Sequence, residues 1–302
     1  MPRRSWKTWS RHCSPRKLRT GAICINEVAT ARKIDCTPYE NRGEMSAIQG
    51  FLEEIFSMDD RSLTLFRKGT GPAVILLHEL PGLTSETVEF AEFIAGRGFH
   101  VVMPLLFGKP LQDPLLGLLK SPVTCIRREF NNFVGGKSSP VTVSLRALCR
   151  KLHAERGGPG VGAIGMCYTG GFIFAMMVEK ALLAPVTAQP SLPLFQPEAL
   201  DVEPGKLMAA SRRDDGMSLL GLRFGDDPRC PAARFASLQA ALETEPEATM
   251  CRFRPVVIPG RGHSTLTFDY QAALDAGVDT RDLVLQHLRT RLFPPALQAT
   301  LN

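Results

Sequence analysis

A cysteine stands where an apolar run meets a glycine-rich turn. The run Val161–Ile164 leads through two residues into Cys167, and a second apolar stretch, typical of a helix, begins at Gly170. A sharp strand-to-helix turn needs small neighbours and exposes the side chain at its apex, while the helix N-terminus behind it favours negative charge. The pattern predicts Cys167 as a nucleophile, although Thr169 stands where such turns usually have glycine. A buried cysteine in a nucleotide-binding turn is the alternative.

Two further groups of chemically useful side chains follow later in the chain. The run LLGLRFGDDPRCP contains two adjacent aspartates, Asp226 and Asp227, and His263 lies in a glycine-flanked loop after the run VVIP. A histidine can take the proton of a weak nucleophile, and a carboxylate can orient that histidine. The order nucleophile, acid, base is the one that α/β-hydrolases use. The alternatives are a turn carboxylate that caps the next helix and a structural loop histidine.

The elements that must position these residues alternate between strand and helix from residue 62 onward. Such alternation favours a parallel sheet, and the site is then expected at the carboxyl ends of the strands. The predicted strands are Leu63–Phe66, Ala73–Leu77, His100–Met103, Val161–Ile164, Ala184–Ala188, Leu219–Phe224 and Phe253–Ile258. The predicted helices are Glu86–Arg97, Val141–Ala154, Gly170–Lys180, Arg234–Leu242 and Thr280–Leu292. Residues Val141, Leu145, Leu148 and Leu152 lie on one face of the second helix.

The loop after the strand Ala73–Leu77 gives the pattern a family resemblance. It reads His-Glu-Leu-Pro-Gly from His78 to Gly82, whereas a serine esterase would tend to carry His-Gly there. Together with the cysteine turn, the aspartate turn and the Gly-His-Ser segment, this loop resembles the dienelactone hydrolase family over roughly residues 60–292. The resemblance implies an α/β class fold, the α/β-hydrolase fold, with a mostly parallel central sheet and helices on both faces.

The resemblance also implies roles for single residues. Cys167 is the expected nucleophile and His263 its base. Asp227 is the expected acid because Asp-Pro-Arg-Cys-Pro resembles the family's Asp-x-x-x-Pro turn, with Asp226 as the alternative. Glu79 would sit beside the thiol and help to deprotonate it when substrate arrives.

Two backbone N–H groups, those of Leu80 and Tyr168, would form the oxyanion hole. The implied reaction is the hydrolysis of a small ester or lactone, of the carboxymethylenebutenolidase type, through a covalent acyl-enzyme. No cofactor and no metal are expected.

One departure limits what the resemblance implies about substrate. Family members that open dienelactone bind its carboxylate through arginines, one of them four residues after the histidine, and here that place is Thr267. Arg127, Arg128 and Arg261 are candidates to replace it, and a different small ester or lactone stays open. The alternative functions are a non-catalytic α/β-hydrolase relative acting as a binding protein and a thiol redox enzyme, although Cys167 has no obvious resolving cysteine nearby.

Charge and composition exclude several classes of protein. Of the 302 residues, 44% are hydrophobic and 22% charged, which is ordinary for a soluble globular protein, and no apolar run approaches membrane-spanning length. Residues 1–44 carry ten Lys and Arg residues against four acidic residues, which accounts for the whole net charge of +6. Because residues 45–302 are neutral, we expect a small-molecule substrate, no nucleic acid and no membrane partner. The oligomeric state is not predicted.

Cysteine spacing and the N-terminal segment complete the sequence picture. The eight cysteines form no CxxC or CxxH pair, which argues against zinc, and a chain with its own core needs no disulfides. We therefore expect a reducing, cytoplasmic location. Residues 1–44 lack apolar periodicity and are interpreted as a disordered or mis-called N-terminal extension, with a targeting segment or a structural element as the alternatives. Residues 45–302 are predicted to form a single α/β-hydrolase domain.

Overall fold

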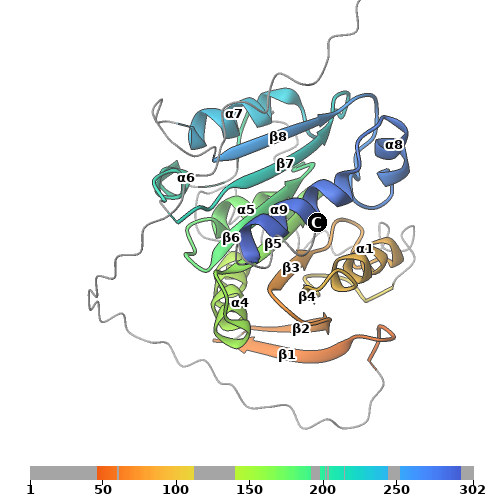
Figure 1. Cartoon of the computed structure of the whole chain (residues 1–302), viewed down its shortest axis with the longest axis vertical. Coiled ribbons are helices and arrows are strands. Elements are labelled where there is room, and N and C mark those ends of the chain that lie inside the picture. Colours follow the sequence, from red (N-terminus) through yellow and green to blue (C-terminus); the bar gives the residue numbers. More distant parts are fainter. Residues whose placement is uncertain are drawn as a thin grey trace, which may run out of the picture.

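The fold is seen in a computed structural model (Figure 1), which describes residues 46–59, 61–111, 140–191, 198–200, 202, 204–213, 215–243 and 252–293. The predicted extension, residues 1–44, lies outside these ranges. No helix within them is long and apolar enough to cross a membrane.

An eight-stranded sheet forms the centre of the described structure. Its strands are β1 (Leu52–Met58), β2 (Arg61–Lys68), β3 (Ala73–Leu77), β4 (His100–Pro104), β5 (Val161–Met166), β6 (Leu182–Ala188), β7 (Leu219–Phe224) and β8 (Phe253–Ile258). Their order is β1-β2-β4-β3-β5-β6-β7-β8. Strands β3 to β8 are parallel, whereas β2 pairs antiparallel with both β1 and β4. This topology agrees with the predicted α/β-hydrolase fold.

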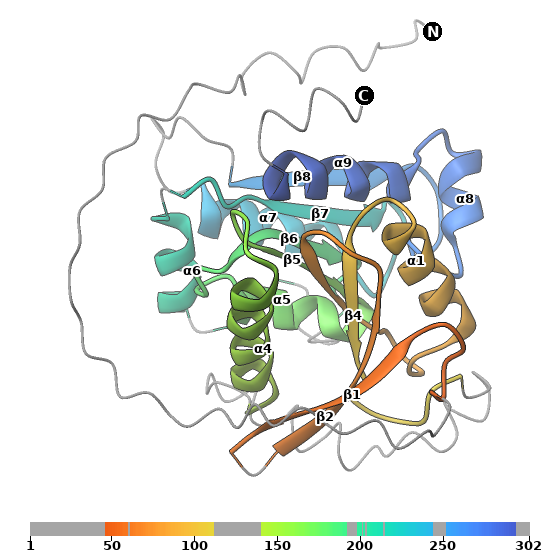
Figure 2. The same cartoon turned by 60° about the horizontal axis from the view of Figure 1, so that its bottom comes forward.

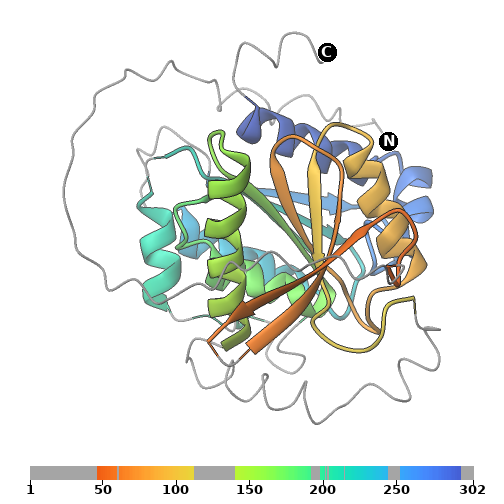
Figure 3. The ribbon, with the colours of Figure 1, turned by 90° about the horizontal axis from the view of Figure 1, so that it is seen from below.

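Helices cover both faces of the sheet. They are α1 (Ser85–Ala95), α4 (Pro140–Arg156), α5 (Gly170–Met176), α6 (Pro204–Ser211), α7 (Ala232–Leu242), α8 (Tyr270–Asp275) and α9 (Thr280–Leu292), and a short 3-10 turn, η2 (Cys167–Thr169), precedes α5. Helices α1 and α9 lie on one face, and α4, α5 and α7 on the other (Figure 2 and Figure 3). Each parallel strand is joined to the next through a crossover, so the carboxyl ends of β3 to β8 share one edge.

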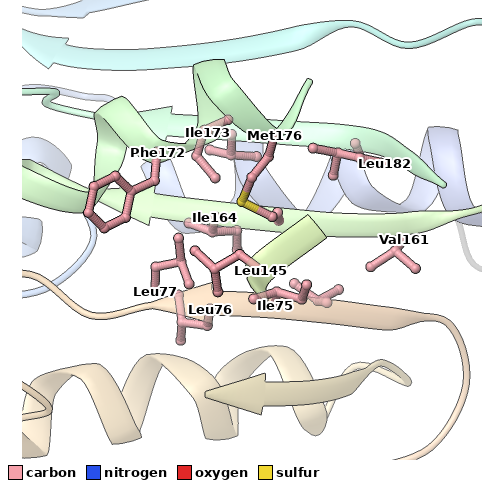
Figure 4. Packing of buried hydrophobic residues seen from close by; sticks show 14 of the residues in the cluster. Ile75, Leu76, Leu77, Leu145, Val161, Ile164, Phe172, Ile173, Met176 and Leu182 are labelled. Carbon is pink, nitrogen blue, oxygen red and sulfur yellow. The ribbon is translucent and has the colours of Figure 1, made fainter. Parts of the chain in front are cut away.

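The core explains why the central strands are continuous apolar runs. All residues of β3 and β5 are buried, because a parallel strand with helices on both faces has no solvent side. In Figure 4, Leu145 of α4 and Met176 of α5 pack beside Ile164 of β5. On α4, Leu145, Leu148 and Leu152 are buried as the periodicity predicted, whereas Val141 is only partly buried.

The differences from the predicted elements lie at the periphery. Strand β1 was not predicted because most of its residues are only partly buried or exposed, so its apolar alternation is weak. Helix α5 ends at Met176 rather than at Lys180, since the chain turns there, with the Glu179 N–H donating to the Met176 carbonyl. The short helices α6 and α8 were also not predicted. Strands β3, β7 and β8 and helix α9 have the predicted bounds.

Candidate active site

The residues singled out in the sequence come together at the carboxyl edge of the sheet. Glu79 follows β3, Cys167 follows β5, Asp227 follows β7 and His263 follows β8. Hydrogen bonds link Asp227 to His263 and link Glu79 to the loop that carries His263. Residues far apart in the sequence thus form one cluster, as the strand-end rule predicted.

The turn around Cys167 has the backbone geometry of a nucleophile elbow. Cys167 has a φ of 53°, a left-handed conformation that costs energy for a residue other than glycine. A Cβ on Gly165 would meet the Thr169 carbonyl oxygen at 2.4 Å, so this position requires glycine. Thr169, the departure from the usual elbow, is buried, and its hydroxyl accepts a hydrogen bond from the Met166 N–H at 3.0 Å. The threonine therefore stabilises the turn from within.

A buried histidine–carboxylate pair lies next to this elbow. The Nδ1 of His263 is 2.7 Å from the Oδ2 of Asp227, and both side chains are buried. Burial raises the pKa of Asp227, but the hydrogen bond with His263 outweighs it and the pKa is lowered. Burial likewise lowers the pKa of His263, but Asp227 and the nearby Cys167 raise it to about 9. The alternative acid, Asp226, is exposed.

The loop that carries His263 is fixed through its backbone. The N–H groups of His263 and Ser264 both donate to Oδ2 of Asp269, at 2.7 and 2.9 Å. A Cβ on Gly262 would lie 2.6 Å from the ring of Phe224, which explains the glycine before the histidine. Asp269 was not predicted from the sequence, since a carboxylate six residues after a loop histidine follows no known pattern.

The sulfur of Cys167 has a partner that the sequence did not reveal. Its Sγ lies 3.2 Å from the hydroxyl of Ser191, and the Ser191 N–H donates to the Cys167 carbonyl at 3.2 Å. The Nε2 of His263 is buried and has no hydrogen-bond partner among the described residues. Asp227 thus holds Nδ1 of the imidazole, while Nε2 is the nitrogen that can accept a proton from the nearby Cys167 thiol.

Glu79 is held by hydroxyl and amide donors rather than by the thiol. Its carboxylate accepts hydrogen bonds from Ser264 at 2.9 Å, from Gln189 at 3.3 Å and from Thr267. Burial raises its pKa, although these hydrogen bonds act in the opposite direction. Within the described residues, it makes no hydrogen bond with Cys167. Glu79 therefore stabilises the loop that carries His263 through hydrogen bonds from Ser264 and Thr267. Thr267, at the position where the family resemblance implies an arginine, is a neutral donor to the Glu79 carboxylate.

Gln189 and Ser191 are the site residues that sequence reasoning missed. Gln189 has a φ of 39°, is fully buried, and accepts from the backbone N–H of Thr265 at 3.2 Å while its amide nitrogen donates to Glu79. Both residues follow the predicted strand that ends at Ala188, so the strand-end rule was a signal that could have found them.

The remaining predicted groups are a pair of backbone donors and three arginines. Leu80 follows Glu79 on the β3 loop, and its N–H has no acceptor among the described residues; Tyr168 follows Cys167 in the elbow. Arg261 is exposed on the His263 loop, whereas residues 127 and 128 lie outside the described residues. In the part of the chain that the structure describes, no three His, Cys, Asp or Glu side chains cluster as a metal ion would require.

Comparisons with known proteins agree with this geometry. The profile of the dienelactone hydrolase family matches residues 63–215. A dienelactone hydrolase-like promiscuous phosphotriesterase from metagenomic libraries superposes with a TM-score of 0.56 at 17% identity, covering 78% of this chain and 97% of its own. Dienelactone hydrolase from Anabaena variabilis gives 0.54 at 16% identity, covering 81% and 100%.

A cold-adapted esterase from an Arctic intertidal metagenomic library gives a TM-score of 0.54 at 17% identity, covering 83% of this chain and 98% of its own. At these identities the structures share the fold alone. Among curated proteins, no sequence relative was found.

Proposed function

The chain belongs to the dienelactone hydrolase family, a family of ester hydrolases, and on that premise we propose that it hydrolyses a small ester or lactone through Cys167, His263 and Asp227. The observation that carries the proposal is the buried Asp227–His263 hydrogen bond of 2.7 Å, next to a cysteine in a strained turn that contributes to the raised pKa of His263.

In the proposed acylation step, Nε2 of His263 accepts the thiol proton of Cys167 in those molecules whose imidazole is neutral, and the sulfur attacks the substrate's carbonyl carbon. A carbon–sulfur bond forms, and the carbonyl electrons move onto oxygen. The N–H groups of Leu80 and Tyr168 stabilise that oxyanion. Collapse of the intermediate breaks the carbon–oxygen bond, and the imidazolium gives its proton to the leaving alcohol, which leaves a thioester on Cys167.

Hydrolysis of the thioester repeats these steps with water as the nucleophile. His263 takes the water proton and returns it to the departing sulfur. The Asp227 carboxylate holds the imidazole in one tautomer and stabilises the imidazolium that forms twice per cycle, which is the physical meaning of the raised pKa of His263.

We propose a second role for Glu79, as an acceptor of the thiol proton when substrate is bound. In this structure the Glu79 carboxylate accepts hydrogen bonds from Ser264, Gln189 and Thr267, and within the described residues it makes none with Cys167. Reaching the sulfur requires Glu79 to leave Ser264 and Gln189, which makes activation dependent on substrate.

Turnover of p-nitrophenyl acetate tests the proposal, with dienelactone assayed beside it as the family's substrate. Cys167→Ala should abolish turnover, and Cys149→Ala should retain it, because Cys149 is a buried cysteine of α4. Equal activity in wild type and Cys167→Ala, or no turnover of any small ester, contradicts the proposal and favours a binding protein instead.

A further inference from the structure

The peptide bond between Glu79 and Leu80 is held at its carbonyl end. The Glu79 carbonyl oxygen accepts hydrogen bonds from the Gly82 N–H at 2.8 Å and from Nδ1 of His78 at 3.2 Å. This peptide is trans and planar, so its N–H points opposite to its C=O. Fixing the carbonyl therefore fixes the direction of the Leu80 N–H, one of the two proposed oxyanion donors.

The protonation of His78 follows from its second nitrogen. The Leu106 N–H lies 3.1 Å from Nε2 of His78, so Nε2 must be the unprotonated acceptor. A neutral imidazole then carries its hydrogen on Nδ1, which donates to the Glu79 carbonyl. Burial lowers the pKa of His78 to about 4, which keeps this neutral tautomer at physiological pH.

The ring is anchored to the neighbouring strand as well. His78 follows β3, and Leu106 lies two residues past the end of β4, so the imidazole connects the carboxyl ends of two adjacent strands. Its ring packs edge-on against Phe107, with centroids 4.4 Å apart, and Phe107 in turn contacts the ring of Tyr168 at 6.2 Å. His78 thus reaches one proposed donor through the Glu79–Leu80 peptide and the residue of the other, Tyr168, through the ring of Phe107.

We propose that His78 is a positioning residue for the oxyanion hole. It touches neither the substrate nor the triad, and acts through the Glu79–Leu80 peptide. The chain of hydrogen bonds from Leu106 through the imidazole to the Glu79 carbonyl also polarises that peptide, which strengthens its N–H as a donor. The inference rests on the proposed function, since an oxyanion hole has a use only in acyl transfer.

The test compares two reactions of the same sulfur. Hydrolysis of p-nitrophenyl acetate passes through an oxyanion, whereas alkylation of Cys167 by iodoacetamide occurs at a saturated carbon and needs none. His78→Phe keeps the ring beside Phe107 and removes both hydrogen bonds. We expect kcat to fall about tenfold, the effect of losing the hydrogen bond from His78 to the Glu79 carbonyl, with KM and the alkylation rate within about twofold of wild type. Alkylation is followed at Cys167 by peptide mass spectrometry.

Two further variants keep the test decisive if His78→Phe is unstable. His78→Gln retains a donor and an acceptor on one side chain, and should recover kcat to within about threefold. His287→Phe removes another buried, neutral histidine, on α9 beside Ser218 at the opposite end of the sheet. It should leave kcat unchanged in the folded fraction, which near-UV circular dichroism measures.

The outcomes separate this inference from the proposed function. Unchanged kcat in His78→Phe, or an equal fall in kcat and in the alkylation rate, overturns the positioning role. Failure of the proposed function appears instead in the wild type, as turnover that does not depend on Cys167.

Discussion

Replacing Asp227 by asparagine should remove most of the catalytic power of His263. The two side chains are 2.7 Å apart, and the pKa of His263 is raised from 6.5 to about 9. The hydrogen bond with Asp227 is the first of the causes that raise this pKa, and Cys167 contributes to the same shift. A hydrogen bond to a charged group is worth about 1.5–3 kcal/mol, which at about 1.4 kcal/mol per tenfold predicts a fall in kcat of roughly 10- to 100-fold when it is lost. Asparagine also presents an amide N–H to Nδ1, which favours the wrong tautomer.

Asp226→Asn is the matched control, because Asp226 is the preceding residue of the same turn and is exposed. Both variants are assayed with p-nitrophenyl acetate at pH 7, and their unfolding free energies are measured in urea. Asp226→Asn should stay within about threefold of wild-type kcat. The reasoning is refuted if Asp227→Asn keeps kcat within threefold of wild type while remaining folded, or if the two variants rank the other way.

Three further predictions concern the groups around this pair. By NMR, His263 should titrate near pH 9 in the wild type and at a lower pH in Asp227→Asn, and an unshifted midpoint contradicts the pairing. Because the pKa of His263 is raised in the folded protein, its contribution to the free energy of unfolding is complete below about pH 6.5 and is lost as the pH rises through about 9. Glu79→Gln should lower kcat/KM about 10²-fold without unfolding the protein, and wild-type turnover would reduce Glu79 to a bracing carboxyl. Gly165→Ala should cost about 2 kcal/mol in urea unfolding, whereas Gly205→Ala on α6, where a Cβ meets nothing, should cost none; equal effects would show that the elbow tolerates a side chain.

The fold was predictable because its signals are local and strong. The central strands are continuous apolar runs bounded by Gly and Pro, so β3, β7 and β8 were predicted to the residue. Strand β1 was not, because an edge strand next to solvent carries Glu53 and Glu54 and shows little periodicity. Its place in the sheet comes from pairing with β2, a tertiary contact that no window of sequence displays.

The candidate site was predictable where chemistry follows a strand end in a known order. Asp227 and His263 met these conditions, and their hydrogen bond was the expected one. The contacts of Gln189, Ser191 and Asp269 were not predictable, since an amide, a hydroxyl and a turn carboxylate are common in loops. These side chains find their partners only where loops from different strands meet in three dimensions, and the same is true of the donors to the Glu79 carboxylate.

The central claim is that an acyl group is carried by one cysteine, and its most direct test is the mass of the trapped intermediate. The protein is mixed with excess p-nitrophenyl acetate, quenched in acid within the first turnovers and digested. The masses of the cysteine-containing peptides are then measured by mass spectrometry. We predict an acetyl group on the Cys167 peptide that disappears when substrate is exhausted, with none on the peptides of the other buried thiols, Cys149 and Cys230. The acid quench stops deacylation, so an acyl group on Cys167 would be retained. Turnover without an acetyl group on the Cys167 peptide, or with the acetyl group on another peptide, would contradict the account.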